Sequence, residues 1–139
     1  MTSTVIHSVR SDSTVKKAAE RMKEVHVGCL VVIDGGRLVG IISERDIVQR
    51  VVAEGKSIHM TRVSQIMSKP VVTTSPAAKV PDAAKLMLKH KIRRLPVRKG
   101  TKVVGMLTTT DYARYLCKEI AYNPLLGAAA RAEYQTIFE

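Results

Sequence analysis

Two short stretches of the chain contain residues whose types and spacing could hold a phosphate and a sugar. One runs from Gly40 to Asp46 and the other from Gly105 to Asp111, and each ends in Ser/Thr-x-x-Asp at the expected start of a helix. Amides in the first turn of a helix are unpaired and lie at the positive end of the helix dipole. A hydroxyl and a carboxylate placed there can bind a phosphate and a sugar diol. The same spacing also forms a helix-capping box, and both interpretations remain open for one copy.

The chain contains an internal repeat, and the two stretches define its offset of 65 positions. The same offset aligns apolar and glycine positions along most of the chain without a gap. The aligned pairs include Val15 with Val80, Met22 with Met87, Leu30 with Leu95 and Gly35 with Gly100. A duplication is the simplest explanation. Two copies of the motif in equivalent places favour a ligand site over a cap alone.

Each half is expected to fold as β-α-β-β-α, which places the motif at the junction between the last strand and the second helix. A short extended run precedes an amphipathic helix, and a glycine turn then joins two strands into a hairpin. The segments are 5–9, 15–22, 29–33, 38–42 and 44–53 in the first half, and 71–73, 80–87, 95–98, 102–107 and 109–116 in the second. The fold class is α/β (α+β). The two three-stranded halves must pack together, because each alone buries too little apolar surface.

The expected organisation is a first repeat at 1–55, a linker at 56–70, a second repeat at 71–119 and a helical tail at 120–139. The linker is expected to form one helical turn that ends before Pro70, since the residue before a proline avoids the helical region. The tail is expected to cap the domain or to pack on a partner.

Composition limits the classes of ligand and partner. The 139 residues are 45% hydrophobic and 25% charged, as in an ordinary folded domain, and the net charge of +11 favours polyanions or phosphorylated ligands. A nucleic-acid-binding protein is therefore the alternative, although solvation alone also produces charged faces, and the absence of Trp leaves few residues for base stacking. The basic residues concerned are Lys16, Lys17, Arg21, Lys23, Lys85, Lys89, Lys91 and Arg93.

The sequence does not indicate a catalytic or metal site. The four histidines lack metal-ligand spacing and no nucleophile signature is present, so we expect a protein that is not an enzyme. Cys29 and Cys117 lie far apart in apolar segments, which is typical of buried free thiols in a reducing compartment. The N-terminus lacks the apolar region of a signal peptide and no run is long enough to cross a bilayer, so we expect a cytoplasmic protein without a membrane partner.

Three features together resemble the cystathionine-β-synthase-type (CBS) domain, present as the tandem pair called a Bateman module. They are the Gly-x-x-Ser/Thr-x-x-Asp motif in both halves, Arg93-Arg94-Leu95-Pro96-Val97, and Val63-Ser64-Gln65-Ile66-Met67 before the second repeat. The resemblance implies a pseudo-twofold pair with two clefts, usually assembled as a homodimer. It also implies a stand-alone sensor that binds AMP, ADP or ATP, or less typically S-adenosylmethionine, and that regulates a separate protein without requiring a cofactor.

The resemblance also implies which residues contact the ligand. Asp46 and Asp111 would each accept hydrogen bonds from a ribose diol, and Ser43 and Thr108 would contact phosphate oxygens. The other expected ligand-binding residues are His7, Val27, Gly28, Ile41, Arg45, Val72, Ile92, Arg93, Arg94, Met106 and Thr110.

The resemblance pairs each aspartate with the other repeat. Asp111 would face His7 and Val27, and Asp46 would face Val72 and Ile92. Arg93 and Arg94 occur in the second repeat alone, where they are expected to approach phosphates. Arg45 is a cation in the first turn of a helix, which is unfavourable unless Glu44 or a ligand phosphate lies beside it. The two clefts are therefore expected to differ in affinity.

Overall fold

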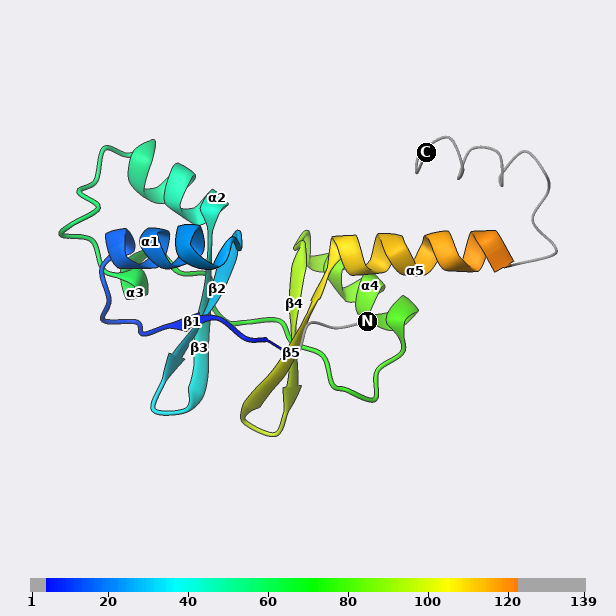
Figure 1. Cartoon of the computed structure of the whole chain (residues 1–139). Coiled ribbons are helices and arrows are strands. Elements are labelled where there is room, and N and C mark those ends of the chain that lie inside the picture. Colours follow the sequence, from blue (N-terminus) through cyan, green and yellow to red (C-terminus); the bar gives the residue numbers. More distant parts are fainter. Residues whose placement is uncertain (1–4, 123–139) are drawn as a thin grey trace.

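A computed structural model of the chain describes residues 5–122, which form two similar halves joined by a linker. The first half contains β1 (Ser8–Val9), α1 (Val15–Val25), β2 (Cys29–Asp34), β3 (Arg37–Ser43) and α2 (Glu44–Ile47), which continues as the π-helix η1 (Val48–Val52). The linker contains α3 (Val63–Ile66), and the second half contains α4 (Val80–His90), β4 (Arg94–Lys99), β5 (Lys102–Thr108) and α5 (Thr109–Tyr122). In Figure 1 the two sheets lie in the middle and the helices lie on the outer sides.

The offset of 65 positions is visible in details of the backbone. His26 and Lys91 end α1 and α4 in the left-handed conformation, with φ of 57° and 53°. Both hairpins shift register at the same point, between Val32 and Ile33 and between Val97 and Arg98. The two hairpin turns lie at the same end of the molecule (Figure 1). The duplicated sequence therefore produces a duplicated fold, as the repeat predicts.

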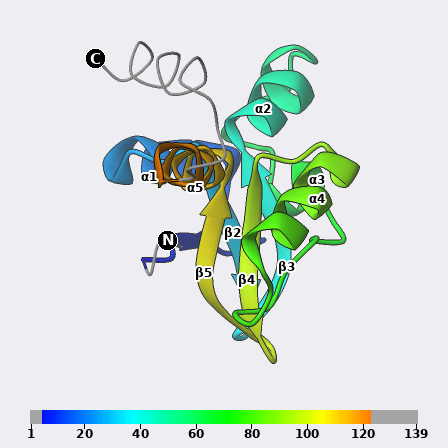
Figure 2. The ribbon, with the colours of Figure 1, turned by 90° about the vertical axis from the view of Figure 1, so that its right-hand side faces the viewer.

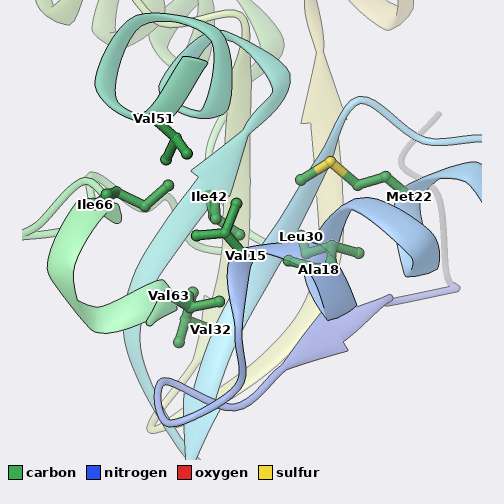
Figure 3. Packing of buried hydrophobic residues seen from close by; sticks show 9 residues of the cluster. All are labelled: Val15, Ala18, Met22, Leu30, Val32, Ile42, Val51, Val63 and Ile66. Carbon is green, nitrogen blue, oxygen red and sulfur yellow. The ribbon is translucent and has the colours of Figure 1, made fainter. Parts of the chain in front are cut away.

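A helix covers one face of each sheet because its apolar residues recur with helical spacing. In the first half Val15, Ala18 and Met22 of α1 are buried against Leu30 and Val32 of β2. Figure 3 shows that side chains of η1 and α3 complete this cluster. The second half has a smaller cluster of buried residues, which consists of Ala83, Met87, Leu95 and Leu107.

The sheet faces that the helices do not cover meet at the centre of the molecule. Side chains alternate along a strand, so Val31 points away from the helices that cover Leu30 and Val32, and yet it is fully buried. In β4, Arg94 and Pro96 lie on the face opposite Leu95, and Pro96 is also fully buried. The strands β3 and β5 approach each other across this centre. Figure 2 views the molecule from the side of the second repeat, with β4 and β5 in front of β2 and β3.

The second sheet has two strands, whereas the sequence predicts three. Residues 71–73 form no strand, and a single parallel bridge joins Thr74 to Val97. The Thr74 amide donates to the Pro96 carbonyl at 3.0 Å, and the Arg98 amide donates to the Thr74 carbonyl at 2.8 Å. In the first half the Val31 amide donates to the His7 carbonyl, but the equivalent residue of β4 is Pro96, which has no amide proton to donate to the Val72 carbonyl.

The linker packs on the first half. The Val15 amide donates to the Thr61 carbonyl at 2.9 Å, and the Val63 amide donates to the Ser13 carbonyl at 2.8 Å. Val63 and Ile66 of α3 belong to the first core, so the expected helical turn is present and contributes to stability.

The C-terminal helix differs from the expectation at its end. The helix α5 continues to Tyr122, so it crosses the boundary expected at residue 120. Residues 123–139 of the expected tail lie outside the described residues.

Candidate ligand-binding site

Both motif aspartates form helix caps with the same geometry. The Asp46 Oδ2 atom accepts hydrogen bonds from the Ser43 amide at 2.9 Å and the Ser43 hydroxyl at 3.0 Å. The Asp46 amide donates to the same hydroxyl at 3.2 Å. Thr108 and Asp111 repeat these contacts at 2.9, 3.0 and 3.1 Å. The capping box expected from the sequence is therefore present in both halves.

The caps limit what the first helical turn can offer to a phosphate. The Glu44 amide donates to the Gly28 carbonyl and the Thr109 amide to the Arg93 carbonyl, each at 2.9 Å. A hydroxyl has one proton to donate, and in each cap it is directed at the aspartate. A phosphate, which only accepts hydrogen bonds from such groups, could be contacted by Ser43 or Thr108 only after that hydroxyl rotates. The phosphate role of both residues stays a prediction.

The second oxygens of the two carboxylates have different partners. The Asp46 Oδ1 atom accepts a hydrogen bond from the Ser68 hydroxyl at 3.2 Å and lies 3.8 Å from Arg50 Nη1. The Asp111 Oδ1 atom lies 3.7 Å from Arg114 Nη1. Both aspartate side chains are mostly buried, with relative exposures of 11% for Asp46 and 13% for Asp111.

Arg50 connects the first motif to the linker. Its Nη1 atom donates to the Ile66 carbonyl at 2.8 Å, at the C-terminal end of α3, in addition to its ion pair with Asp46. Ser68 is held beside it, because its amide and carbonyl both bond to Ile41 of β3, at 2.8 and 3.1 Å. Asp46 is thus in contact with the segment that leads into the second repeat.

A groove of about 810 Å³ lies where α1, the start of α2 and β4 meet. Of the expected ligand-binding residues it contains Val27, Gly28 and Arg94, together with Glu44, and neither aspartate is among its lining residues. The remaining lining residues are Ala19, Met22, Lys23, His26, Ile47 and Val48. Lys23 and Arg94 bring two positive charges to the groove against the one carboxylate of Glu44, so it is suited to an anionic group.

Arg94 reaches the first repeat because position 28 is a glycine. A Cβ atom on Gly28 would lie 2.7 Å from the Arg94 guanidinium and 3.3 Å from the Glu44 carboxyl group. Glu44 therefore lies near Arg94, whereas no ion pair between Glu44 and Arg45 occurs in residues 5–122.

The other expected residues do not converge on this groove. Val72 and Ile92 pack against the second core, and the half-buried His7 lies beside β2, where its carbonyl accepts the Val31 amide at 3.2 Å. Ile41 and Met106 lie on the strand faces opposite the buried Ile42 and Leu107, toward the other repeat. Arg45, Arg93 and Thr110 are exposed. The expected facing of Asp111 with His7 and Val27, and of Asp46 with Val72 and Ile92, stays a prediction.

The thiols and histidines do not suggest chemistry of their own. Cys29 is buried between the repeats, and this burial raises the pKa of its thiol to about 11, against the opposing effect of the Arg94 charge. Within residues 5–122, no cluster of three or more histidine, cysteine or acidic side chains could hold a metal ion. Within the same residues, no helix is long and apolar enough to cross a bilayer.

Comparison with known proteins gives consistent matches. The CBS domain family matches residues 1–53 and 63–118. The CBS domain-containing protein YhcV of Bacillus subtilis is 36% identical over 110 residues, which span 79% of this chain and 78% of that protein.

Two solved structures have the same fold. A protein with CBS domains from Burkholderia ambifaria has a TM-score of 0.78 at 32% identity, over 88% of both chains. The CBS domain pair of protein MJ0100, solved in complex with 5'-methylthioadenosine and S-adenosyl-L-methionine, has a TM-score of 0.78 at 28% identity. That match covers 85% of this chain and 93% of the other. The chain therefore belongs to the CBS domain family and contains two copies of the domain, packed as a pair.

Proposed function

We propose that this CBS domain pair is a regulatory module that binds an adenosine-containing ligand, AMP, ADP or ATP in preference to S-adenosylmethionine, between its two repeats. Asp46 and Asp111 bind the ribose hydroxyls of the ligand. Arg94, in the groove beside Gly28, is available to the phosphates. The module acts by binding and not by catalysis, and it regulates a separate protein.

One observation carries this proposal. Two mostly buried carboxylates occupy equivalent positions in the two repeats, and each is oriented by the same two hydrogen bonds from its own cap residue. An oriented carboxylate is a strong acceptor for a diol, because hydrogen bonds to a charged group are stronger than those between neutral groups. The related CBS pair in complex with two adenosyl compounds supports the same ligand class.

Isothermal titration calorimetry with AMP, ADP, ATP, S-adenosylmethionine and 5'-methylthioadenosine tests the proposal. We expect saturable binding of at least one adenine nucleotide, and weaker binding of the matching 2'-deoxynucleotide, which lacks one diol hydroxyl. Inosine monophosphate serves as a control for recognition of the base. Failure of every adenosine compound to bind at millimolar concentration would refute the proposal.

The alternative of nucleic-acid binding depends on the net charge of +11 alone. Neither the fold nor the compared relatives add support to it. A gel-shift assay over a range of salt concentrations checks it, since binding through phosphates weakens steeply as salt rises.

We also propose that two copies of the chain associate through their helices. Val48 and Val52 on η1, Leu88 on α4 and Leu116 on α5 are large apolar side chains with exposed fractions of 57%, 64%, 78% and 41%. A second copy that covers them would remove this apolar area from water.

A further inference from the structure

The two motif aspartates differ in how many hydrogen bonds they can still accept. A carboxylate offers about four acceptor positions, two on each oxygen. In both copies the cap uses the two positions on Oδ2, through one amide and one hydroxyl. A ribose diol brings two hydroxyl donors, so it needs the two positions that remain on Oδ1.

At Asp46 one of these two positions is already used. The Ser68 hydroxyl donates to Oδ1 at 3.2 Å, and the Arg50 guanidinium lies 3.8 Å from the same atom. The backbone of Ser68 is fixed beside Asp46, because both its amide and its carbonyl are bonded to Ile41. A diol at Asp46 must therefore displace the Ser68 hydroxyl from Oδ1 by rotation of its side chain.

At Asp111, no donor among residues 5–122 occupies either position on Oδ1. Within residues 5–122, no hydroxyl donates to this atom, and its neighbour is the Arg114 guanidinium at 3.7 Å, beyond hydrogen-bond distance. The Arg114 side chain is 73% exposed, whereas the Arg50 side chain is 49% exposed and is also bonded to the Ile66 carbonyl. Arg114 can therefore move aside more readily than Arg50.

From this difference we infer that the ligand binds first at Asp111, and that Ser68 is an internal competitor for the ribose at Asp46. This inference rests on the proposed function. The Ser68 hydroxyl occupies, on Asp46, the place that one ribose hydroxyl would take. Binding at Asp46 replaces an intramolecular hydrogen bond instead of adding one, so it is the weaker of the two events.

Calorimetric titration of the full chain with AMP tests the inference through four single variants. We expect the tighter site to be lost in Asp111→Asn and kept in Asp46→Asn. We expect Ser68→Ala to tighten the weaker site about fivefold, since one competing hydrogen bond is removed. Ser64→Ala, an exposed serine in the same linker, is the matched control and should change neither affinity.

The outcomes separate the inference from the proposed function. If the tighter site is lost in Asp46→Asn and kept in Asp111→Asn, the inference is wrong but the proposed function stands. The same holds if Ser68→Ala binds more weakly than the wild type. Absence of binding by the wild type and by every variant overturns the proposed function.

One further variant checks whether Asp111 also has a competing serine. Ser3 lies 65 positions before Ser68 and is outside the described residues. Ser3→Ala should leave the affinity at Asp111 unchanged. A tightening there equal to that of Ser68→Ala at Asp46 would show that both carboxylates have a competitor, and would overturn the inference.

Discussion

At the scale of single residues, the capping and ligand-binding interpretations of the motif are compatible. The cap bonds to one carboxylate oxygen, Oδ2, and makes no bond to Oδ1. A substitution that removes the whole side chain would therefore change two things, helix stability and ligand affinity. Loss of a cap alone costs about 0.5–2 kcal/mol. Asparagine keeps the shape and one acceptor, so it is the cleaner substitution at Asp46 and Asp111.

The buried thiol of Cys29 leads to a prediction about stability at high pH. Its pKa is raised from 9.0 to about 11 in the folded chain, so the unfolded chain loses this proton first as the pH rises. The stabilisation is fully present below pH 9.0 and is lost between pH 9.0 and about 11. Urea unfolding followed by circular dichroism should show a larger loss of stability over this interval in the wild type than in Cys29→Ala. Equal losses would show that the thiol titrates normally.

At the scale of elements, the repeat and the hairpins could be predicted from sequence because their signals are local. Apolar spacing and turn glycines place α1, β2 and β3 within two residues of their observed bounds at most ends. The missing strand at 71–73 could not be predicted, because β propensity says nothing about how many pairing partners a segment finds. The π-helix η1 also lacks a sequence signal.

The candidate site was predicted only in part for a similar reason. The caps follow from spacing within one segment. Ser68 and Arg94 act on residues far away in the sequence, so their contacts with Asp46 and Gly28 required the structure. The ion pair of Arg50 with Asp46 could have been predicted from the sequence, since an acid and a base four residues apart on a helix commonly pair.

The contact between the linker and β3 leads to a prediction about two glycines. A Cβ atom on Gly40 would lie 2.5 Å from the Met67 sulfur and 2.9 Å from its Cγ atom, and the neighbouring Ser68 is bonded to Ile41. Gly40→Ala should destabilise the chain by about 1–3 kcal/mol in urea unfolding, as overpacking does.

Gly28→Ala is the matched control for this prediction. Its close contact is with the end of the flexible Arg94 side chain, so the loss of stability should be smaller. If both variants were equally stable, the Met67 packing would not be the cause.

At the scale of the whole molecule, the two repeats are unequal although their backbones match. The second core is smaller, its sheet has one strand fewer, and the linker packs on the first repeat. The first repeat should therefore be the more stable half. Exposed apolar residues occur on both repeats, which supports the proposal that a second copy covers them.

Analytical ultracentrifugation tests the proposed association. The wild type should sediment as a dimer, and Val52→Asp should sediment as a monomer, because a buried charge without a partner opposes association. Met60→Asp changes another exposed apolar residue, in the linker, with an exposed fraction of 79%, and should remain dimeric. A wild type that is monomeric at high concentration would contradict the proposal.

Binding of the ribose by Asp46 and Asp111 is tested by titrating the double variant Asp46→Asn/Asp111→Asn with the nucleotide that binds the wild type best. Each substitution should weaken binding at its own site by about 1–3 kcal/mol, from the lost charge on the diol acceptor. Circular dichroism should show that the double variant stays folded. We expect a folded double variant to have lost affinity at both sites. A folded double variant that binds the nucleotide as tightly as the wild type would contradict this expectation and leave the two aspartates as helix caps.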